Sequence, residues 1–456
     1  MDTKKLRQKI LDLAIHGKLV PQDPNDEPAS VLLERIKVEK EQLIKEGKIK
    51  RSRKSAKTSD TPHYEQVKIE VPNSWYMVSV SDLFLLNPKS ELDDNMKVGF
   101  IPMALVEDGF SGNHFYEERT WKDVKRGYCH FQNGDIGIAK ISPCFENRKS
   151  TIFKNLPNTY GAGTTELVIL RPIKVYTKFY LYLFKSDWYV KEGTKYFKGV
   201  VGQQRVHKEI FTDLHIPLPP FAEQQRIVEE IEYWFALIDQ IEQDKSDLQT
   251  AIRQTKSKIL DLAIHGKLVL QNPNDEPASE LLKRINPKAE ITCDNGHYPQ
   301  LPDGWVVVPM QMLCSLTDGE KLDGKEMPNL DVKYLRGERD FKTQTNGRYV
   351  AANSLLILVD GENSGEVFRT PIEGYQGSTF KQLHINENML AEYILHVINL
   401  HRKALRENKV GSAIPHLDKK LFKAIEVPVP PYDEQVRIVT VINSMHSKLD
   451  AIMENL

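Results

Sequence analysis

The spacing of apolar residues in the middle of the chain predicts one long helix. Between Glu223 and His265 there is no proline or glycine, and apolar side chains recur in a four-three heptad pattern among charged residues. This pattern is typical of a coiled-coil helix, and Gly266 would end it. The predicted seam positions on this helix are Ile227, Ile231, Trp234, Ile238, Ile241, Leu248, Ile252, Ile259 and Leu262.

Two segments of the chain occur twice. Residues 9–36 and 258–285 are identical at 24 of 28 positions, and both contain LDLAIHGKLV. A shorter pair, PLPPFAEQQRIV at 217–228 and PVPPYDEQVRIV at 428–439, includes the start of the predicted helix. Such repeats indicate that one structural unit is used twice.

The repeats also place parts of the predicted helix at both chain ends. The C-terminal copy corresponds to the first half of the central helix and the N-terminal copy to its last part, in the same heptad phase. We therefore predict that the two ends jointly form a helix antiparallel to the central one. The alternative is two unrelated amphipathic helices. The corresponding seam positions are Leu6, Ile10, Leu13, Ile438, Ile442, Met445, Leu449 and Ile452.

Residues within the longer repeat give signals for helix ends. His16 and His265 each lie at the predicted end of a helix, where a capping role is expected. Asp26 and Asp275 are candidate N-caps of the short helix that follows each copy. The two Pro-Pro sequences of the shorter repeat are expected to be hinges that enter helices.

The segments between the repeats predict two copies of one α+β domain. Each begins with a related phrase, EVPNSW or QLPDGW, and continues with short alternating β patterns. Strands are expected within 133–141 and 354–360, and helices around 176–189 and 388–406. The predicted regions are 1–60 (N-terminal helical), 61–216 (first variable domain), 217–297 (central helical), 298–427 (second variable domain) and 428–456 (C-terminal helix).

The charge of the first variable segment suggests a nucleic-acid partner. Residues 119–208 contain 17 lysines and arginines against 6 acidic residues, interleaved with aromatic and amide side chains. In the second variable segment, residues 381–423 contain 8 basic against 4 acidic residues. This composition suits phosphate neutralisation and hydrogen bonding to base edges. A basic stretch is also typical of an ordinary solvated surface, so charge alone leaves both interpretations open.

Other functional classes lack their motifs. No apolar run approaches the roughly 20 residues that cross a membrane, and the four cysteines lack zinc spacing, so we expect a cytoplasmic protein without a metal. The sequences at 218–221 and 429–432 lack the Asn or Asp that precedes Pro-Pro-aromatic in adenine methyltransferases. GEKLDGK at 319–325 is followed by Glu326, where a phosphate loop needs Ser or Thr. No catalytic residue is predicted.

These features together resemble one protein family. The two LDLAIHGKLV segments, the two hinge phrases, GDIGIAKISPCFENRKSTI and GAGTTELVILRP resemble the specificity subunit of a type I restriction–modification enzyme. The resemblance implies a non-catalytic subunit with two pseudo-symmetric target recognition domains, joined by an antiparallel coiled coil. It implies a bipartite, asymmetric target in double-stranded DNA.

The resemblance further implies two methyltransferase subunits and restriction subunits as partners. Those subunits would carry S-adenosylmethionine, ATP and magnesium, and this chain would hold no cofactor. Two alternatives are a self-sufficient DNA methyltransferase or nuclease with fused recognition domains, and a coiled-coil scaffold.

The candidate DNA-contacting residues are polar and basic side chains in turn-rich loops. Arginine suits guanine and glutamine suits adenine in the major groove, and each residue could instead be a turn residue or a phosphate contact. The first variable domain contributes Lys140, Ser142, Asn147, Arg148, Lys149, Thr164, Gln203, Gln204 and Arg205. The second contributes Asn363, Thr379, Lys381, Ser412 and His416.

Overall fold

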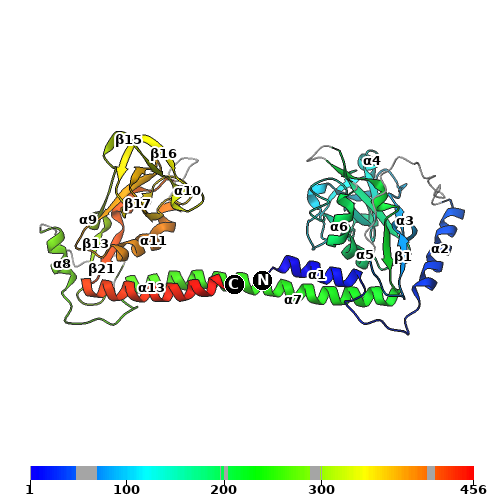
Figure 1. Cartoon of the computed structure of the whole chain (residues 1–456), viewed down its shortest axis with the longest axis horizontal. Coiled ribbons are helices and arrows are strands. Elements are labelled where there is room, and N and C mark those ends of the chain that lie inside the picture. Colours follow the sequence, from blue (N-terminus) through cyan, green and yellow to red (C-terminus); the bar gives the residue numbers. More distant parts are fainter. Residues whose placement is uncertain are drawn as a thin grey trace. The chain divides into compact units, whose positions relative to one another are not determined.

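The chain divides into two compact units, Met1–Gln243 and Asp244–Leu456, which share one long helix, α7 (Phe221–Ile264) (Figure 1). A computed structural model describes residues 2–47, 69–195, 197–199, 204–287, 298, 300–407 and 416–456. Helix α7 confirms the long helix that the heptad pattern predicts. None of the helices in these ranges is long and apolar enough to cross a membrane.

The first unit combines helices with several small sheets. Its other helices are α1 (Thr3–Ile15), α2 (Ala29–Lys45), α3 (Val80–Leu83), α4 (Trp121–Val124), α5 (Thr177–Phe184) and α6 (Asp187–Thr194), with 3-10 turns at Met103–Leu105, Pro157–Thr159 and Lys208–Phe211. Its strands are β1 (Tyr76–Ser79), β2 (Phe84–Leu86), β3 (Lys97–Ile101), β4 (Glu117–Thr120), β5 (Cys129–Gln132), β6 (Ile136–Ala139), β7 (Ser150–Ile152), β8 (Tyr160–Gly163), β9 (Leu167–Pro172), β10 (Phe197–Lys198), β11 (Arg205–Val206) and β12 (His215–Leu218). They form the sheets β1-β12, β2-β9-β6-β7, β4-β3-β8-β5 and β10-β11.

The second unit repeats this plan with different lengths. Its helices are α8 (Ala278–Ile285), α9 (Met310–Leu313), α10 (Val332–Leu335), α11 (Ala391–Glu407), α12 (Lys419–Ala424) and α13 (Tyr432–Glu454). Its strands are β13 (Val306–Pro309), β14 (Cys314–Thr317), β15 (Lys321–Leu330), β16 (Lys342–Val350), β17 (Leu355–Leu358), β18 (Val367–Arg369), β19 (Gly374–Gln376), β20 (Phe380–Ile385) and β21 (Glu426–Val429). The sheets β13-β21 and β14-β20-β17-β18 correspond to β1-β12 and β2-β9-β6-β7, and β15, β16 and β19 form the remaining sheet.

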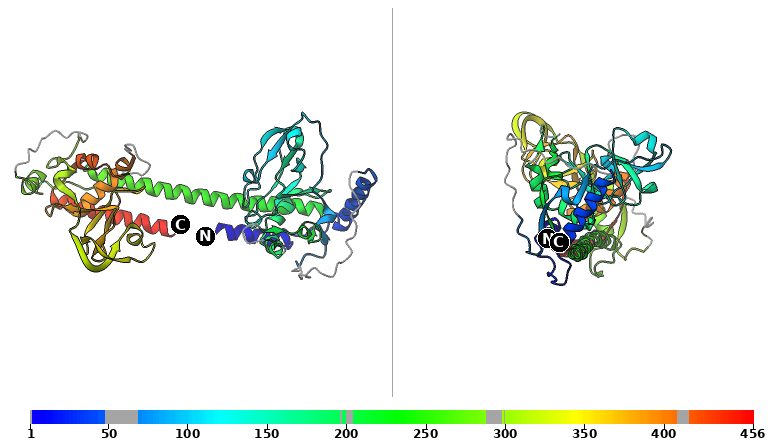
Figure 2. Two further views of the ribbon diagram at one scale, coloured as in Figure 1. Left: turned by 90° about the horizontal axis from the view of Figure 1, so that it is seen from above. Right: turned by 90° about the vertical axis from the view of Figure 1, so that its right-hand side faces the viewer.

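Each terminal helix packs antiparallel against α7 within its own unit (Figures 1 and 2). In the first unit, Arg7 of α1 donates to Glu242 of α7 at 3.0 Å, and it also pairs with Asp239. In the second unit, Lys256 of α7 pairs with Asp450 of α13. These contacts confirm the predicted antiparallel packing of the terminal helices on the central one.

The buried stripe on α7 departs from the predicted heptad seam. Ile227, Ile231 and Ile238 are buried, but Trp234 is 41% exposed and Phe235 is buried in its place. An α-helix with 3.6 residues per turn drifts away from a strict 3.5-residue repeat unless it supercoils, which moves the contact by one position. Of the other seam positions, Ile10, Ile252, Ile259, Ile438 and Ile442 are buried, Leu6, Leu13, Leu262 and Leu449 are half-buried, and Ile241, Leu248, Met445 and Ile452 are exposed.

A buried carboxylate joins α7 to the domain that precedes it in the sequence. Glu223 is 1% exposed, and its Oε2 accepts a hydrogen bond from Trp75 Nε1 at 2.9 Å. Its Oε1 accepts from Gln22 Nε2 at 2.5 Å. Burial raises the pKa of Glu223, while both donors oppose that shift. We call this contact the helix–domain junction.

The second unit contains the same helix–domain junction. Glu434, also 1% exposed, accepts from Trp305 Nε1 at 3.0 Å and from Gln271 Nε2 at 3.1 Å. The two tryptophans belong to the phrases EVPNSW and QLPDGW, and the glutamates to the two hinge repeats. The repeated segments therefore contact one another through these side chains in both units.

The glutamine after each buried glutamate extends the junction. Gln224 accepts from the backbone N–H of Tyr176, at the start of α5, at 2.9 Å and donates to Pro219 O at 2.9 Å. In the second unit, Gln435 accepts from the backbone N–H of Leu390 at 3.0 Å and donates to a Pro-Pro carbonyl at 3.0 Å. The start of α7 is thus bound to the preceding Pro-Pro segment and to the start of α5, and the start of α13 is bound to its own Pro-Pro segment and to the start of α11.

The structure corrects the predicted N-caps. Asp26 is bound by both terminal nitrogens of Arg226 at 2.9 and 2.6 Å, and Asp275 pairs with Arg437 at 2.6 Å. Pro28 and Pro277 occupy the N-cap positions instead. A bidentate pair with a guanidinium is stronger than an exposed cap, so the aspartates bind the neighbouring helix.

The Ile-His-Gly-Lys sequences end helices as predicted. Nδ1 of His16 lies 2.7 Å from the carbonyl of Asp12, one turn earlier. Gly17 follows with a φ of +64°, and a Cβ there would lie 2.5 Å from Pro72. His265 and Gly266 repeat both features against Pro302. Glycine is needed at this position for its backbone conformation and its lack of a side chain.

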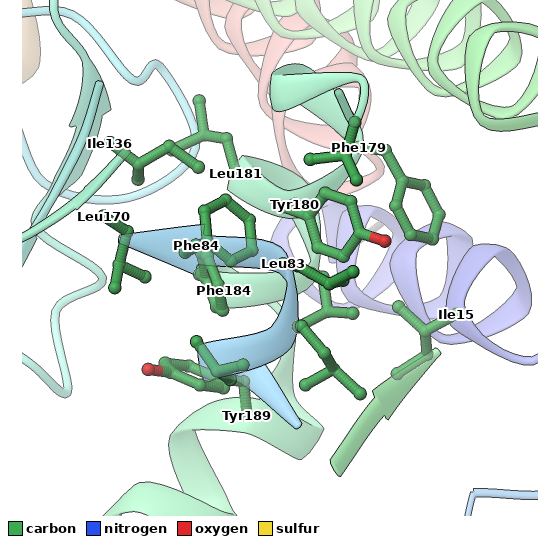
Figure 3. Packing of buried hydrophobic residues seen from close by; sticks show 14 of the residues in the cluster. Ile15, Leu83, Phe84, Ile136, Leu170, Phe179, Tyr180, Leu181, Phe184 and Tyr189 are labelled. Atoms are coloured by element: carbon green, nitrogen blue, oxygen red, sulfur yellow. The ribbon is translucent and has the colours of Figure 1, made fainter. Parts of the chain in front are cut away.

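The core of the first unit lies between α1, α5 and the strands (Figure 3). The rings of Phe84 and Tyr180 pack edge to face with centroids 5.2 Å apart. Ile15 of α1 and Leu83 belong to the same buried cluster, so burying the N-terminal helix contributes to folding of the first unit.

The two units differ in the contact between α5 and α7, which corresponds to the contact between α11 and α13 in the second unit. In the first unit, Phe235 of α7 packs against Tyr182 of α5 with ring centroids 5.7 Å apart. When the register of the shorter repeat is extended along both helices, Phe235 corresponds to His446 of α13. The ring of His446 packs against that of His396 of α11 with centroids 6.2 Å apart. An aromatic pair in one unit is therefore a histidine pair in the other.

Replacement of Glu223 by alanine should destabilise the first unit by about 1–3 kcal/mol, because the buried indole N–H of Trp75 would lose its acceptor. Chemical unfolding of the full chain, followed by hydrogen exchange of each unit, measures the change. The exposed Glu229→Ala on the same helix is the matched control. Equal protection in both variants would show that the junction does not stabilise the domain.

The histidine pair should make the second unit sensitive to acid. Burial lowers the pKa of both His396 and His446, so their contribution is complete above about 6.5 and is lost as pH falls through the lowered values. The charged groups beside the pair are Lys256, Asp450 and Glu392.

The double variant His396→Tyr/His446→Phe installs the kind of pair found in the first unit and should remove this acid sensitivity. Hydrogen exchange of the second unit between about pH 5 and 7 measures it, with the first unit as internal reference. Unchanged acid sensitivity in the variant would contradict the assignment.

Candidate nucleic-acid interface

Three loops of the first unit meet beside β6 and β9. The backbone N–H of Lys140 donates to Glu166 O at 2.9 Å, and that of Val206 donates to Lys140 O at 2.8 Å. The N–H of Ser142 donates to Gln204 O at 2.9 Å. We call this arrangement the three-loop site. It brings together the predicted residues Lys140, Ser142, Thr164, Gln204 and Arg205; Gln203 lies outside the described residues.

A basic pocket of about 480 Å³ opens at the three-loop site. Its apolar floor includes Val168 and Phe211. Its polar and basic lining consists of Asn87, Lys140, Lys198, Arg205, His207 and Lys208. A concave surface with this charge attracts phosphates and focuses the field on them.

One arginine of the pocket is held by a carboxylate. Arg205 donates from Nε to both oxygens of Glu166, at 3.1 and 2.9 Å, and from Nη2 to Oε1 at 2.9 Å. The hydrogen bonds from Arg205 lower the pKa of Glu166, so the carboxylate is ionised at neutral pH. The Arg205 side chain remains 48% exposed, and the pair therefore orients a cation at the surface.

Two of the predicted DNA contacts point into the protein. Arg148 is 12% exposed in its side chain, pairs with Asp187, and donates from Nε to Lys185 O at 3.0 Å. Lys149 donates to the carbonyl of Val106 at 2.8 Å. This geometry does not support base contacts by Arg148 and Lys149, because their donors already have partners that hold the loop between β6 and β7.

Other groups in and beside this loop also face inward. Asn147 takes part through its backbone carbonyl, which accepts from Gly109 N at 2.8 Å. Lys185 is fully buried, and its Nζ donates to the carbonyls of Gly109 at 2.8 Å and Arg148 at 3.0 Å. Burial lowers the pKa of Lys185 to about 7. Part of the basic surplus of the sequence is thus structural.

The second unit contains an equivalent three-loop site. The N–H of Val359 donates to Thr379 O at 2.8 Å, and that of Leu417 donates to Val359 O at 2.8 Å. Asp360 and His416 form an isolated antiparallel bridge, as Ile141 and Arg205 do in the first unit. His416 Nδ1 lies 2.6 Å from Asp360 Oδ1.

The remaining candidates of the second unit have different surroundings. Lys381 pairs with Asp318, which also binds Arg348 at 2.9 Å. Asn363 is a turn residue whose carbonyl accepts from Glu366 N at 3.1 Å. Ser412 lies outside the described residues. The structure thus brings Thr379 and His416 together and leaves Lys381 in an ion-pair cluster.

Several residues of these sites were not predicted from the sequence. Lys198, His207 and Lys208 line the basic pocket, Glu166 binds Arg205, and Asp360 contacts His416 in the second unit. The lysines carry a sequence signal, since they lie in the basic stretch. The two acids carry none, because a search for phosphate and base contacts selects against carboxylates.

Comparison with known proteins identifies the family. Residues 72–250 and 302–456 match the type I restriction modification DNA specificity domain. The chain is 37% identical over 419 residues to the EcoAI specificity subunit of Escherichia coli, covering 79% of this chain and 70% of that protein. The chain belongs to the family of type I restriction–modification specificity subunits.

Further relatives agree with this family. The EcoEI specificity subunit of Escherichia coli is 41% identical over 326 residues, which cover 62% of this chain and about half, 54%, of that protein. The crystal structure of the HsdS subunit from Thermoanaerobacter tengcongensis has a similar fold, with a TM-score of 0.52 at 16% identity over 84% of this chain and 92% of that one.

Family membership confirms several expectations. It confirms a non-catalytic DNA specificity subunit with two target recognition domains and a mixed α+β fold.

No group of three or more His, Cys, Asp or Glu side chains in the described ranges could hold a metal ion.

Substitution of pocket lysines should weaken DNA binding in a salt-dependent manner. In Lys198→Ala/Lys208→Ala, the slope of log K against log salt should decrease by about 2, because each phosphate that a lysine neutralises adds about 0.9 to it. Fluorescence anisotropy of labelled duplex at several salt concentrations measures this slope. Lys9→Ala/Lys37→Ala, on α1 and α2, removes the same charge, and an equal decrease there would contradict a specific role of the pocket.

Proposed function

We propose that this chain selects a bipartite, asymmetric sequence in double-stranded DNA, with one half read by each recognition domain. The observation that carries this proposal is the three-loop site, in which two backbone hydrogen bonds and one isolated antiparallel bridge recur in both units. The first site presents Arg205 with Glu166, and the second presents His416 with Asp360. Equal frameworks with different side chains favour two different half-sites.

We infer recognition domains at 61–216 and 298–427, between helical regions at 1–60, 217–297 and 428–456. Each helix–domain junction fixes a domain to the helices of its unit, and family models match both halves. The helical regions would then set the unread spacing between the half-sites, as in other DNA readers with two fixed modules.

The exposed apolar positions on the helices fit protein partners. Trp234 and Ile241 of α7 are 41% and 44% exposed. Met445 and Ile452 of α13, which correspond to them when the register of the shorter repeat is extended, are 40% and 47% exposed. Exposed apolar surface of this kind favours protein–protein contact. Its repetition supports two methyltransferase subunits that bind in equivalent ways.

The cofactors would belong to the partners. S-adenosylmethionine would be held by the methyltransferase subunits, and ATP and magnesium by restriction subunits that join them on cytoplasmic DNA. In this arrangement the present chain contributes base selection and subunit docking.

Sequencing of methylated adenines tests the proposal. Co-expression of this chain with the methyltransferase subunit of its own host should produce one bipartite motif with two different halves and a fixed spacer. Neither protein expressed alone should methylate DNA. A continuous or palindromic motif, or methylation by this chain alone, would contradict the proposed function.

A further inference from the structure

We propose that Arg205 and His416 are the base-reading residues at one equivalent position of the two recognition domains, each oriented by a carboxylate. This inference rests on the proposed function and adds the chemistry of one base in each half-site. Glu166 and Asp360 act there as positioning residues.

Backbone hydrogen bonds establish the equivalence. Arg205 precedes Val206, whose N–H bonds Lys140 O, and His416 precedes Leu417, whose N–H bonds Val359 O. Val206 and Leu417 are each 4% exposed. Because neighbouring side chains of an extended segment point to opposite sides, a buried residue at one position leaves its predecessor facing outward.

The carboxylates come from different loops in the two units. Glu166 lies in the turn before β9, whereas Asp360 follows β17. The feature common to both units is therefore a tethered nitrogen donor or acceptor at one backbone position. The side chains of Arg205 and His416 remain 48% and 56% exposed, so the tether orients each group and leaves it accessible.

The tether of Arg205 determines which edge of its guanidinium is free. Glu166 occupies Nε and one hydrogen of Nη2. The other Nη2 hydrogen and the Nη1 hydrogens lie together at the outer end of the planar group. Two parallel donors at that spacing match O6 and N7 of guanine in the major groove. The first half-site should therefore contain a guanine that Arg205 reads.

The contact with Asp360 makes the outer nitrogen of His416 a hydrogen-bond acceptor, whereas Arg205 presents donors. An ionised carboxylate only accepts, so Nδ1 carries the hydrogen at its 2.6 Å contact with Asp360 Oδ1. In the neutral ring this leaves Nε2 as an acceptor facing outward. An acceptor in the major groove matches the amino groups of adenine and cytosine. The second half-site should contain one of these bases at the position that His416 reads.

Methylation mapping of the complex with the host methyltransferase subunit tests both assignments. In Arg205→Gln, discrimination for guanine at one position of the first half-site should decrease about tenfold or more, with the second half-site unchanged. His416→Ala should relax one position of the second half-site only. Each variant is the matched control for the other, because the complex and the assay are identical.

Variants of the tethers separate positioning from general structure. Glu166→Gln should relax the same guanine position as Arg205→Gln, and Glu166→Asp should retain part of the preference. Asp360→Asn should relax the position read by His416. A purely structural role would instead lower methylation at every site without changing any base preference, and this result would overturn the assignment of tethers.

The wild-type motif is a test that needs no variant. A first half-site without guanine, a second half-site without adenine or cytosine, or unchanged base preferences in Arg205→Gln would each overturn the inference. In all three cases a bipartite motif would still support the proposed function. Absence of any bipartite motif would contradict the proposed function itself.

Discussion

A buried carboxylate at the start of a helix organises each half of this protein. A carboxylate removed from water is costly unless donors replace the solvent. Glu223 and Glu434 obtain those donors from a tryptophan at the start of the variable domain and from a glutamine within the longer repeat. The requirement to satisfy one charge thus connects three segments that are far apart in sequence.

This connection explains which parts of the sequence are constant. The glutamine that follows each buried glutamate fixes the hinge and the late helix, and the arginine two residues further on binds the aspartate of PNDEP. Gly17 and Gly266 allow the turn after each Ile-His to pack on a proline. The buried glutamate, the arginine and the glycine of each copy contact a residue of another repeated segment, so a change in one would remove a contact from the other.

The sequence was most informative where contacts repeat and least informative where they depend on exact side-chain direction. The long helix, the terminal helices on it and the two α+β domains follow from repeats and apolar periodicity, which survive small geometric drift. Whether Trp234 or Phe235 is buried cannot be derived from apolar periodicity, because a difference of one position depends on how strongly the helices supercoil. Asp26 was wrongly predicted to be an N-cap, because its partner Arg226 lies 200 residues away in sequence and no local pattern indicates that contact.

The candidate interface shows the limit of reasoning from net charge. The sequence identified Lys140, Ser142, Thr164, Gln204 and Arg205, which the structure brings together, and also Arg148 and Lys149, whose donors are used inside the fold. Lys185 likewise counts as a positive charge in the sequence but is buried against two carbonyls.

Conversely, the acids near the three-loop sites would be discarded by any search for phosphate contacts. A flexible arginine loses side-chain entropy when it binds a base, and a carboxylate that holds it in advance reduces that entropic cost. Acidic residues that pair with exposed cations are therefore informative about specificity, while the count of basic residues is informative mainly about non-specific affinity.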